Sequence, residues 1–240
     1  MTELKDKVIV VTGAGRGAGR SIALALARER ARLALAARTE TELNAVRDEV
    51  QALGAEAIAI PTDLSDPNQV AHLAKKTLDT FGTVDVIINN AGWCPPLRLV
   101  QDTTIEDWDF AMNVNARGPF LLIKALLPTM LAKRSGYVIN ISSEVARGGC
   151  ATASAYSASK AALLALGESL LDEVAPFGIR VTNVLPGTMN TGMRWDDNPD
   201  FPRETVMEPD DLAQVVVDLL KLNDYVLVRE IPVRPIQGDE

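Results

Sequence analysis

Short apolar runs alternate with longer segments of helical periodicity along almost the whole of this 240-residue chain. The runs are rich in β-branched residues and nearly continuously apolar, which is typical of strands buried on both faces of a sheet. They cover residues 7–12, 33–37, 57–60, 84–88, 136–142 and 179–185, with a seventh strand expected at 229–234. Helical patterns cover residues 17–30, 41–53, 67–81, 105–132, 155–175 and 209–221. The alternation predicts a doubly wound parallel sheet in a three-layer α/β/α domain.

Residues that start and stop helices fall between these runs. Thr39 and Glu42 have the spacing of a capping box at the start of the second helix, and Gly54 is expected to end that helix. Pro67 and Pro209 stand where a first helical turn accepts proline. These local signals agree with the helix boundaries that the periodicity predicts.

Bulk composition limits the class of protein. With 47% hydrophobic and 23% charged residues and no linker-like tract, residues 1–240 are expected to form one domain. The net charge of −8 and the lack of clustered Lys and Arg argue against nucleic acid as a partner. The chain begins without a signal-peptide pattern and contains no apolar run long enough to cross a bilayer. We therefore expect a cytoplasmic protein that has no membrane partner.

Histidine and cysteine are too few for several kinds of site. His72 is the single histidine, so neither a Ser-His-Asp triad nor a zinc site built on several histidines is expected except across subunits, and no metal site is expected. His72 falls on the polar side of its helical pattern, which predicts a surface position. Cys94 and Cys150 provide no disulfide framework.

A glycine cluster follows the first predicted strand and opens the first predicted helix. Ligands of parallel sheets bind beyond the carboxyl ends of the strands, and here the sequence reads TGAGRGAG. Glycines permit a tight turn and let a pyrophosphate approach backbone N–H groups at a helix N-terminus. The alternative is a glycine-rich turn without a ligand. In this βαβ context the cluster predicts a Rossmann-like dinucleotide site that includes Gly13, Gly15, Gly17 and Gly19.

The end of the second strand indicates which dinucleotide binds. Sites for NAD place an acidic residue there, but this chain has Ala37 followed by Arg38. Arg16 projects from the glycine loop toward the same region. Two guanidinium groups suit a ribose 2′-phosphate, so NADP(H) is predicted, although Glu40 lies close by.

Two further strand ends carry candidate cofactor residues. Asp63 and Leu64 follow the third strand, where the carboxylate could accept the adenine amino group or merely begin the turn before the next helix. Asn90, Ala91 and Gly92 follow the fourth strand, where small residues and amides allow the backbone to run beneath a ribose.

The candidate reacting group is Tyr156. Tyr156 and Lys160 are four residues apart in a predicted helix and share one face. An ammonium group close to a tyrosine lowers its pKa from about 10 and makes it a usable proton donor or acceptor. Ser143 ends the fifth strand, where it could hold a substrate oxygen or simply cap the strand. Asn115 interrupts an apolar helical pattern, where it could kink the helix and hold a water or be a satisfied core amide.

Together these motifs resemble the short-chain dehydrogenase/reductase family over residues 7 to about 220. The motifs are TGAGRGAG, Asp63-Leu64, NNAG at 89–92, NVNARG at 113–118, Ser143 thirteen residues before Tyr156, YSASK at 156–160, and Pro186-Gly187. The resemblance implies that Tyr156 is the general acid/base and that Ser143 orients the substrate carbonyl. Lys160 would bind the nicotinamide ribose, and Asn115 would position a water in a proton relay. Pro186, Gly187, Met189 and Thr191 would meet the nicotinamide carboxamide.

The chain departs from the family at its end, where Asp-Gly-Gly is often found after a strand. Here the seventh run contains Pro232, which restricts it to a sheet edge or a bulge. A homodimer through the two long helices is expected, with a homotetramer as the alternative.

The resulting functional prediction is an NADP(H)-dependent oxidoreductase that acts on a small-molecule carbonyl or secondary alcohol. A polar, proline-bearing loop at 189–207, containing Trp195 and Phe201, is a candidate substrate lid, and the surrounding loops favour an apolar or aromatic ketone. One alternative is reduction of a 3-oxoacyl thioester, with Lys133, Arg134 and Arg117 as candidates for docking an acidic carrier. Another is a catalytically inactive NADP-sensing protein on the same fold.

Overall fold

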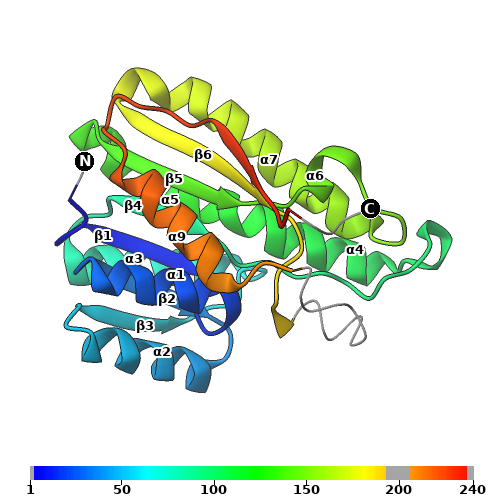
Figure 1. Ribbon diagram of the computed structural model, residues 1–240, viewed down its shortest axis with the longest axis horizontal. Helices are drawn as coiled ribbons and strands as arrows, with labels where there is room; N and C mark the ends of the chain where they lie inside the picture. Colours follow the sequence, from blue (N-terminus) through cyan, green and yellow to red (C-terminus); the bar gives the residue numbers. More distant parts are fainter. Residues whose placement is uncertain (1–2, 193–205, 237–240) are drawn as a thin grey trace.

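Seven parallel strands form one twisted sheet in the computed structural model, which describes residues 3–192 and 206–236 (Figure 1). The strands are β1 (Val8–Thr12), β2 (Arg32–Ala37), β3 (Ala57–Pro61), β4 (Val86–Asn89), β5 (Gly136–Ile141), β6 (Ile179–Pro186) and β7 (Glu230–Val233). Their order in the sheet is β3-β2-β1-β4-β5-β6-β7. The chain reverses its direction of travel across the sheet between β1 and β4. The predicted doubly wound domain is confirmed, and this reversal marks the expected ligand crevice.

Helices cover both faces of the sheet. The helices α1 (Gly17–Arg28), α2 (Glu40–Ala52) and α9 (Pro209–Lys221) pack on one face, and α3 (Pro67–Phe81), α5 (Gly118–Lys133) and α7 (Ser154–Val174) pack on the other. Within β1, Val8 and Val10 join the core under α3, α5 and α7, whereas Ile9 and Val11 join the opposite core. Alternate side chains of a strand point to opposite faces, so burial on both sides requires the continuous apolar run that the sequence shows.

Helix ends follow the predicted signals with one exception. Gly54 has φ +85° just beyond α2, and Pro67 and Pro209 are the first residues of their helices. The predicted capping box at Thr39 is wrong, because the Thr39 side chain makes no capping hydrogen bond. Its partner Glu42 turns toward the glycine loop instead, where Oε2 lies 3.5 Å from the position that a Cβ on Gly15 would take.

The predicted helix at 105–132 is continuous but changes its winding. It consists of α4 (Ile105–Met112), a π-helical turn (Asn113–Arg117) and α5. The π turn contains Asn115, the residue that was predicted to distort the helix. Single π turns inside α-helices are frequent at functional sites.

A row of buried amides crosses the centre of the sheet. Asn89, Asn140 and Asn183 are register partners on β4, β5 and β6. The Asn89 amide nitrogen donates to Asn140 Oδ1 at 2.8 Å, and the Asn140 nitrogen donates to Asn183 Oδ1 at 3.0 Å. Helix α7 lies directly on this row, because a Cβ on Gly167 would come within 2.2 Å of Asn183 Oδ1. We call these three residues the asparagine ladder.

The last strand lies at the sheet edge, as predicted. Pro232 of β7 is paired with Leu185 of β6, its one neighbouring strand, so the missing N–H of the proline faces outward. Short segments outside the sheet layers are α6 (Val145–Gly148) and two 3₁₀ turns, Val100–Asp102 and Ala175–Phe177.

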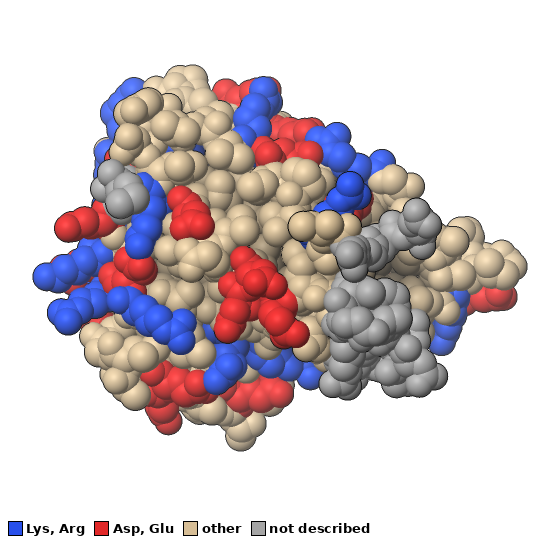
Figure 2. Space-filling view, viewed as in Figure 1, with Lys and Arg blue, Asp and Glu red and all other residues tan. Residues whose placement is uncertain are grey.

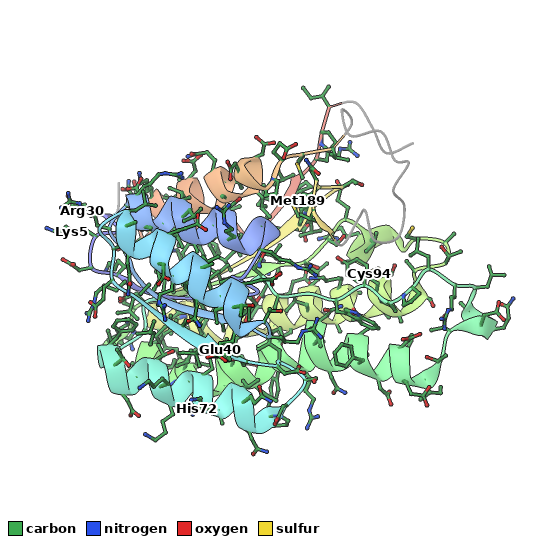
Figure 3. The ribbon with its side chains drawn as sticks, turned by 90° about the horizontal axis from the view of Figure 1, so that it is seen from below. Lys5, Arg30, Glu40, His72, Cys94 and Met189 are labelled. Atoms are coloured by element: carbon green, nitrogen blue, oxygen red, sulfur yellow. The ribbon has the colours of Figure 1, made fainter. Side chains whose placement is uncertain are left out.

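Charged side chains of both signs occupy the surface. On the face seen in Figure 2, Lys and Arg alternate with Asp and Glu over the described residues. His72 is exposed on α3, as predicted, and projects from the outer side of that helix (Figure 3). Within residues 3–192 and 206–236, no helix has the length and apolar character needed to span a bilayer.

Candidate active site

The glycine loop between β1 and α1 is shaped by close backbone contacts. Gly13 and Gly17 have φ of +67° and +54°, a conformation that other residues adopt only with strain. A Cβ on Gly13 would lie 2.8 Å from Ala91 Cα, and a Cβ on Gly19 would lie 2.1 Å from the Gly13 carbonyl oxygen. The start of α1 therefore presses against the loop. Its N-terminus opens toward the carboxyl edge of the sheet, which suits a pyrophosphate.

Thr12 and Asn90 bind the loop to the segment after β4. Thr12 Oγ1 accepts the backbone N–H groups of Asn90 and Ala91, both at 3.1 Å. The Asn90 side chain donates to the Thr12 carbonyl at 2.9 Å. Asn90, predicted as a cofactor residue, thus stabilises the glycine loop in this structure. The glycine loop and the segment after β4, both predicted to bind the cofactor, are joined by these hydrogen bonds.

The segment after β6 faces the glycine loop. The Thr191 methyl group lies 3.4 Å from the position of a Cβ on Gly17. Met189 pairs with Met207, and the Asn190 N–H donates to the Met207 carbonyl at 2.8 Å. The two ends of the predicted lid are therefore joined at their base. Residues 193–205 of that prediction, including Trp195 and Phe201, lie outside the described residues.

The region expected for the ribose phosphate contains exposed cations. Arg16 and Arg38 are both exposed, and the Arg38 guanidinium lies 5.9 Å from the centroid of the Phe110 ring. Asp63 Oδ1 accepts hydrogen bonds from the N–H and the hydroxyl of Ser65, at 2.8 and 2.7 Å. This contact favours the turn-forming interpretation of Asp63 over the adenine-binding one.

Tyr156 and Lys160 project from the start of α7 toward the same edge. The Lys160 amine lies 5.8 Å from the centroid of the Tyr156 ring and donates to the Ile141 carbonyl at 2.9 Å. It also lies 3.2 Å from the position of a Cβ on Gly92, so a larger residue there would require the amine to shift. Lys160 is 3% exposed, and Ser142 fixes its backbone by donating to its carbonyl at 2.9 Å.

Burial dominates the electrostatics of this pair. Loss of hydration raises the pKa of Tyr156 above its usual value, the charge of Cys94 acts in the same direction, and a hydrogen bond with Ser143 opposes both. Burial lowers the pKa of Lys160 from 10.5 to about 8, against the opposing effect of Cys94. In the protein alone, desolvation outweighs any lowering of the Tyr156 pKa by Lys160. The expected lowering also counted the positive charge of oxidised nicotinamide, and it stays a prediction. Tyr156 is protonated at neutral pH and can act as a proton donor.

Asn115 organises the surroundings of the tyrosine. Its Oδ1 accepts the Trp93 N–H at 2.8 Å, and its Nδ2 donates to the Trp93 carbonyl at 2.8 Å and to Ser159 Oγ at 2.9 Å. Ser159 Oγ in turn donates to the Tyr156 carbonyl at 2.8 Å. Trp93 and Cys94 lie in the loop after NNAG, which the sequence places at the pocket mouth, whereas Ser159 did not appear among the predicted site residues. The signal for Ser159 was its position three residues after Tyr156 on the same helix.

The family model of the short chain dehydrogenases matches residues 7–201. This chain belongs to the short-chain dehydrogenase family. It is accordingly an oxidoreductase of a family that uses nicotinamide cofactors.

Individual short-chain dehydrogenases match almost the full chain. An uncharacterised oxidoreductase of Staphylococcus aureus is 36% identical over 98% of this chain and 100% of its own length. The crystal structure of a metagenomic short-chain oxidoreductase in complex with NADP has a TM-score of 0.87 at 35% identity, covering 99% of this chain and 100% of that one. An alcohol dehydrogenase of the archaeon Thermococcus sibiricus, complexed with 5-hydroxy-NADP, has a TM-score of 0.90 at 32% identity, covering 98% and 100%.

Two of the three residues suggested for docking a carrier protein lie away from the site, whereas Arg117 ends the π turn that contains Asn115. Lys133 and Arg134 end α5 just before β5, at the amino edge of the sheet. Lys133 donates to the Val84 carbonyl at 2.6 Å, and the Arg134 guanidinium lies over the Phe177 ring at 5.4 Å. Figure 3 shows Cys94 toward the opposite end of the molecule from Lys5 and Arg30, which mark the amino edge. These two cations are therefore not beside the short-chain dehydrogenase site.

Proposed function

We propose that this enzyme transfers a hydride between NADP(H) and a carbonyl or secondary alcohol substrate, with Tyr156 as general acid/base. The observation that carries the proposal is the meeting of Tyr156, Lys160 and Ser143 with Gly92 at the sheet edge that also bears the glycine loop. A bound nicotinamide would supply the hydride to the carbonyl carbon, or take it from the alcohol carbon.

Each side chain has a distinct part in carbonyl reduction. Protonated Tyr156 donates its hydroxyl proton to the carbonyl oxygen, which becomes the alcohol oxygen. Ser143 donates a hydrogen bond that holds the same oxygen. Lys160 binds the nicotinamide ribose, and Asn115 keeps the Trp93 loop and α7 in a fixed relation and continues the proton relay through a water. Tyr156 carries its proton at neutral pH, as a proton donor in carbonyl reduction must, and burial raises its pKa further.

The cofactor residues are proposed from the same geometry. The pyrophosphate would lie against the glycine loop (Gly13, Gly15, Gly17, Gly19), and the nicotinamide carboxamide would meet the segment Pro186, Gly187, Met189 and Thr191. The adenosine half would lie near Leu64 and Ala91, with Arg16 and Arg38 on the 2′-phosphate. Support for NADP(H) comes from these two exposed guanidinium groups and from the NADP-bound relatives.

The substrate and the cellular setting belong to the same proposal. Half-buried Trp93 and Cys94 follow Gly92 directly, which favours an apolar or aromatic ketone. Residues 189–207 would form a lid over it, within a single domain of 240 residues. The position of Lys133 and Arg134 gives no support to an acyl-carrier substrate. We further propose a cytoplasmic enzyme that forms a homodimer.

The experiment is NADPH oxidation against a panel of ketones, diketones, sugars and acyl thioesters. Tyr156→Phe is expected to lower turnover of the best ketone by about 100- to 10,000-fold, because the proton donor is lost, while the Kd of NADPH changes by less than about twofold. Tyr225→Phe is the matched control, since Tyr225 is 87% exposed. A Tyr156→Phe variant as fast as the parent would show that the mechanism is wrong.

A further inference from the structure

Phe110 faces Arg38 across the carboxyl edge of the sheet. Arg38 follows β2, whereas Phe110 lies on α4, and the guanidinium carbon is 5.9 Å from the ring centroid. This distance is within the range of a cation–π interaction. Among the described residues, Arg38 has no hydrogen-bond or ion-pair partner, so the ring is its one directional contact.

The Phe110 ring is itself packed against another aromatic side chain. Trp93 packs edge-on against Phe110, with centroids 4.8 Å apart and planes at 84°. The backbone N–H and carbonyl of Trp93 both bond to the Asn115 side chain. Phe110 is half-buried in this arrangement, whereas Arg38 is exposed. A fixed ring thus contacts a long side chain that would otherwise be free to sample many rotamers.

The pair spans the region that we assign to the adenosine half of the cofactor. Leu64, three residues after β3, packs so closely on α5 that a Cβ on Gly118 would lie 2.7 Å from the Leu64 carbonyl oxygen. This contact places the segment after β3 beside the first residue of α5, which continues from α4 through the π turn. A guanidinium group can stack its face on a ring while its edge N–H groups remain available to a phosphate.

We propose that Phe110 is a positioning residue for cofactor selection, which holds the Arg38 guanidinium ready for the ribose 2′-phosphate. The inference rests on the proposed preference for NADP(H). It predicts that Phe110 contributes to the binding of NADPH and not to that of NADH, which has no 2′-phosphate.

The test is a set of fluorescence titrations with NADPH and NADH, which need no substrate. The proteins are the wild type, Phe110→Leu, Arg38→Ala and the double variant. Phe110→Leu is expected to weaken NADPH binding about two- to fivefold and leave NADH binding unchanged. In the Arg38→Ala background, Phe110→Leu should have no further effect, because the two residues act as a pair. Phe110→Tyr should restore the wild-type Kd of NADPH.

Phe177→Leu is the matched control, because Phe177 lies under Arg134 in the same kind of pair at the other end of the sheet. It should change neither Kd. The inference would be overturned if Phe110→Leu weakened the binding of NADPH and NADH equally. It would also be overturned if Phe110→Leu still weakened NADPH binding in the Arg38→Ala background, because the ring would then serve general packing. An unchanged NADPH Kd would overturn it while leaving the proposed function intact. A wild-type protein that binds both dinucleotides equally would refute the cofactor preference itself.

Discussion

Lys160 combines a proposed role in cofactor binding with an unfavourable environment. Its amine is buried and donates to the Ile141 carbonyl, and its pKa is lowered from 10.5 to about 8 by desolvation. A lowered lysine pKa means that the folded state holds the proton less tightly than the unfolded state does. The charged amine therefore opposes folding below about pH 8, and this penalty is relieved as the pH rises toward about 10.5.

Comparison with Lys160→Met tests this directly. The free energy of unfolding of the wild type should rise relative to that of the variant by about 3 kcal/mol between about pH 7 and pH 10.5. Urea unfolding of both proteins over this range measures the difference, and other titrating groups largely cancel. If the free energies of unfolding of the wild type and of Lys160→Met changed in parallel with pH, the amine would be hydrated in the folded protein.

Some site residues could be predicted from the sequence because their relation is local. Tyr156 and Lys160 share a helix face through their spacing alone. Trp93 and Phe110 could not be found in this way, because their contacts depend on how the segment after β4 folds against α4. The raised pKa of Tyr156 was also beyond sequence reasoning, since the spacing reveals the nearby ammonium group but not the loss of hydration.

At the level of elements, the contact between α1 and the glycine loop leaves no space for a side chain. A methyl group on Gly19 would meet the Gly13 carbonyl oxygen at 2.1 Å and the Asn90 amide nitrogen at 2.6 Å. Both are held in place, Gly13 by its turn and Asn90 by Thr12. A substitution here must move the helix relative to β1.

Gly19→Ala is expected to lower the free energy of unfolding by about 1–3 kcal/mol through overpacking and to abolish detectable binding of dinucleotide. Chemical denaturation and NADPH titration measure the two effects. Gly148→Ala is the control, since nothing lies within 4 Å of its Cβ position and its φ is not positive. If Gly19→Ala bound NADPH like the wild type, the loop would not be the phosphate site.

The strands could be predicted from the sequence, whereas the start of α2 and the π turn could be predicted only in part. Strand runs were identifiable because burial on both faces requires apolar residues at every position. The capping box at Thr39 failed because Glu42 is turned toward Gly15, a contact that local spacing does not reveal. The π turn was partly visible through Asn115, but its winding depends on the bonds of that side chain to Trp93 and Ser159.

For the whole molecule, an apolar stripe suggests how two copies would meet. Ile105, Trp108 and Phe120 are 71%, 40% and 45% exposed. Residues three or four apart share a helix face, and half-buried Met112 and Ala116 continue the stripe from α4 to α5. A continuous exposed apolar surface of this kind is typical of an interaction site.

We expect the proposed dimer to form through this stripe. Light scattering coupled to size exclusion should give twice the chain mass of 25.8 kDa for the wild type and the chain mass for Phe120→Glu, because a buried carboxylate has no partner there. Tyr225→Glu serves as the control, since Tyr225 is exposed in a loop after α9. A dimeric Phe120→Glu protein, or a monomeric wild type, would contradict this arrangement.

The asparagine ladder has a consequence for how the molecule assembles. If one strand slid by a single residue, its amide would turn to the opposite face of the sheet. There it would meet the apolar core under α1 and α9 with no partner, at a penalty of about 1–3 kcal/mol for each unpaired amide. Parallel strands of similar apolar composition otherwise have little to distinguish one alignment from the next. The three amides thus favour one alignment of β4, β5 and β6 once helices cover the sheet, because only that alignment pairs them.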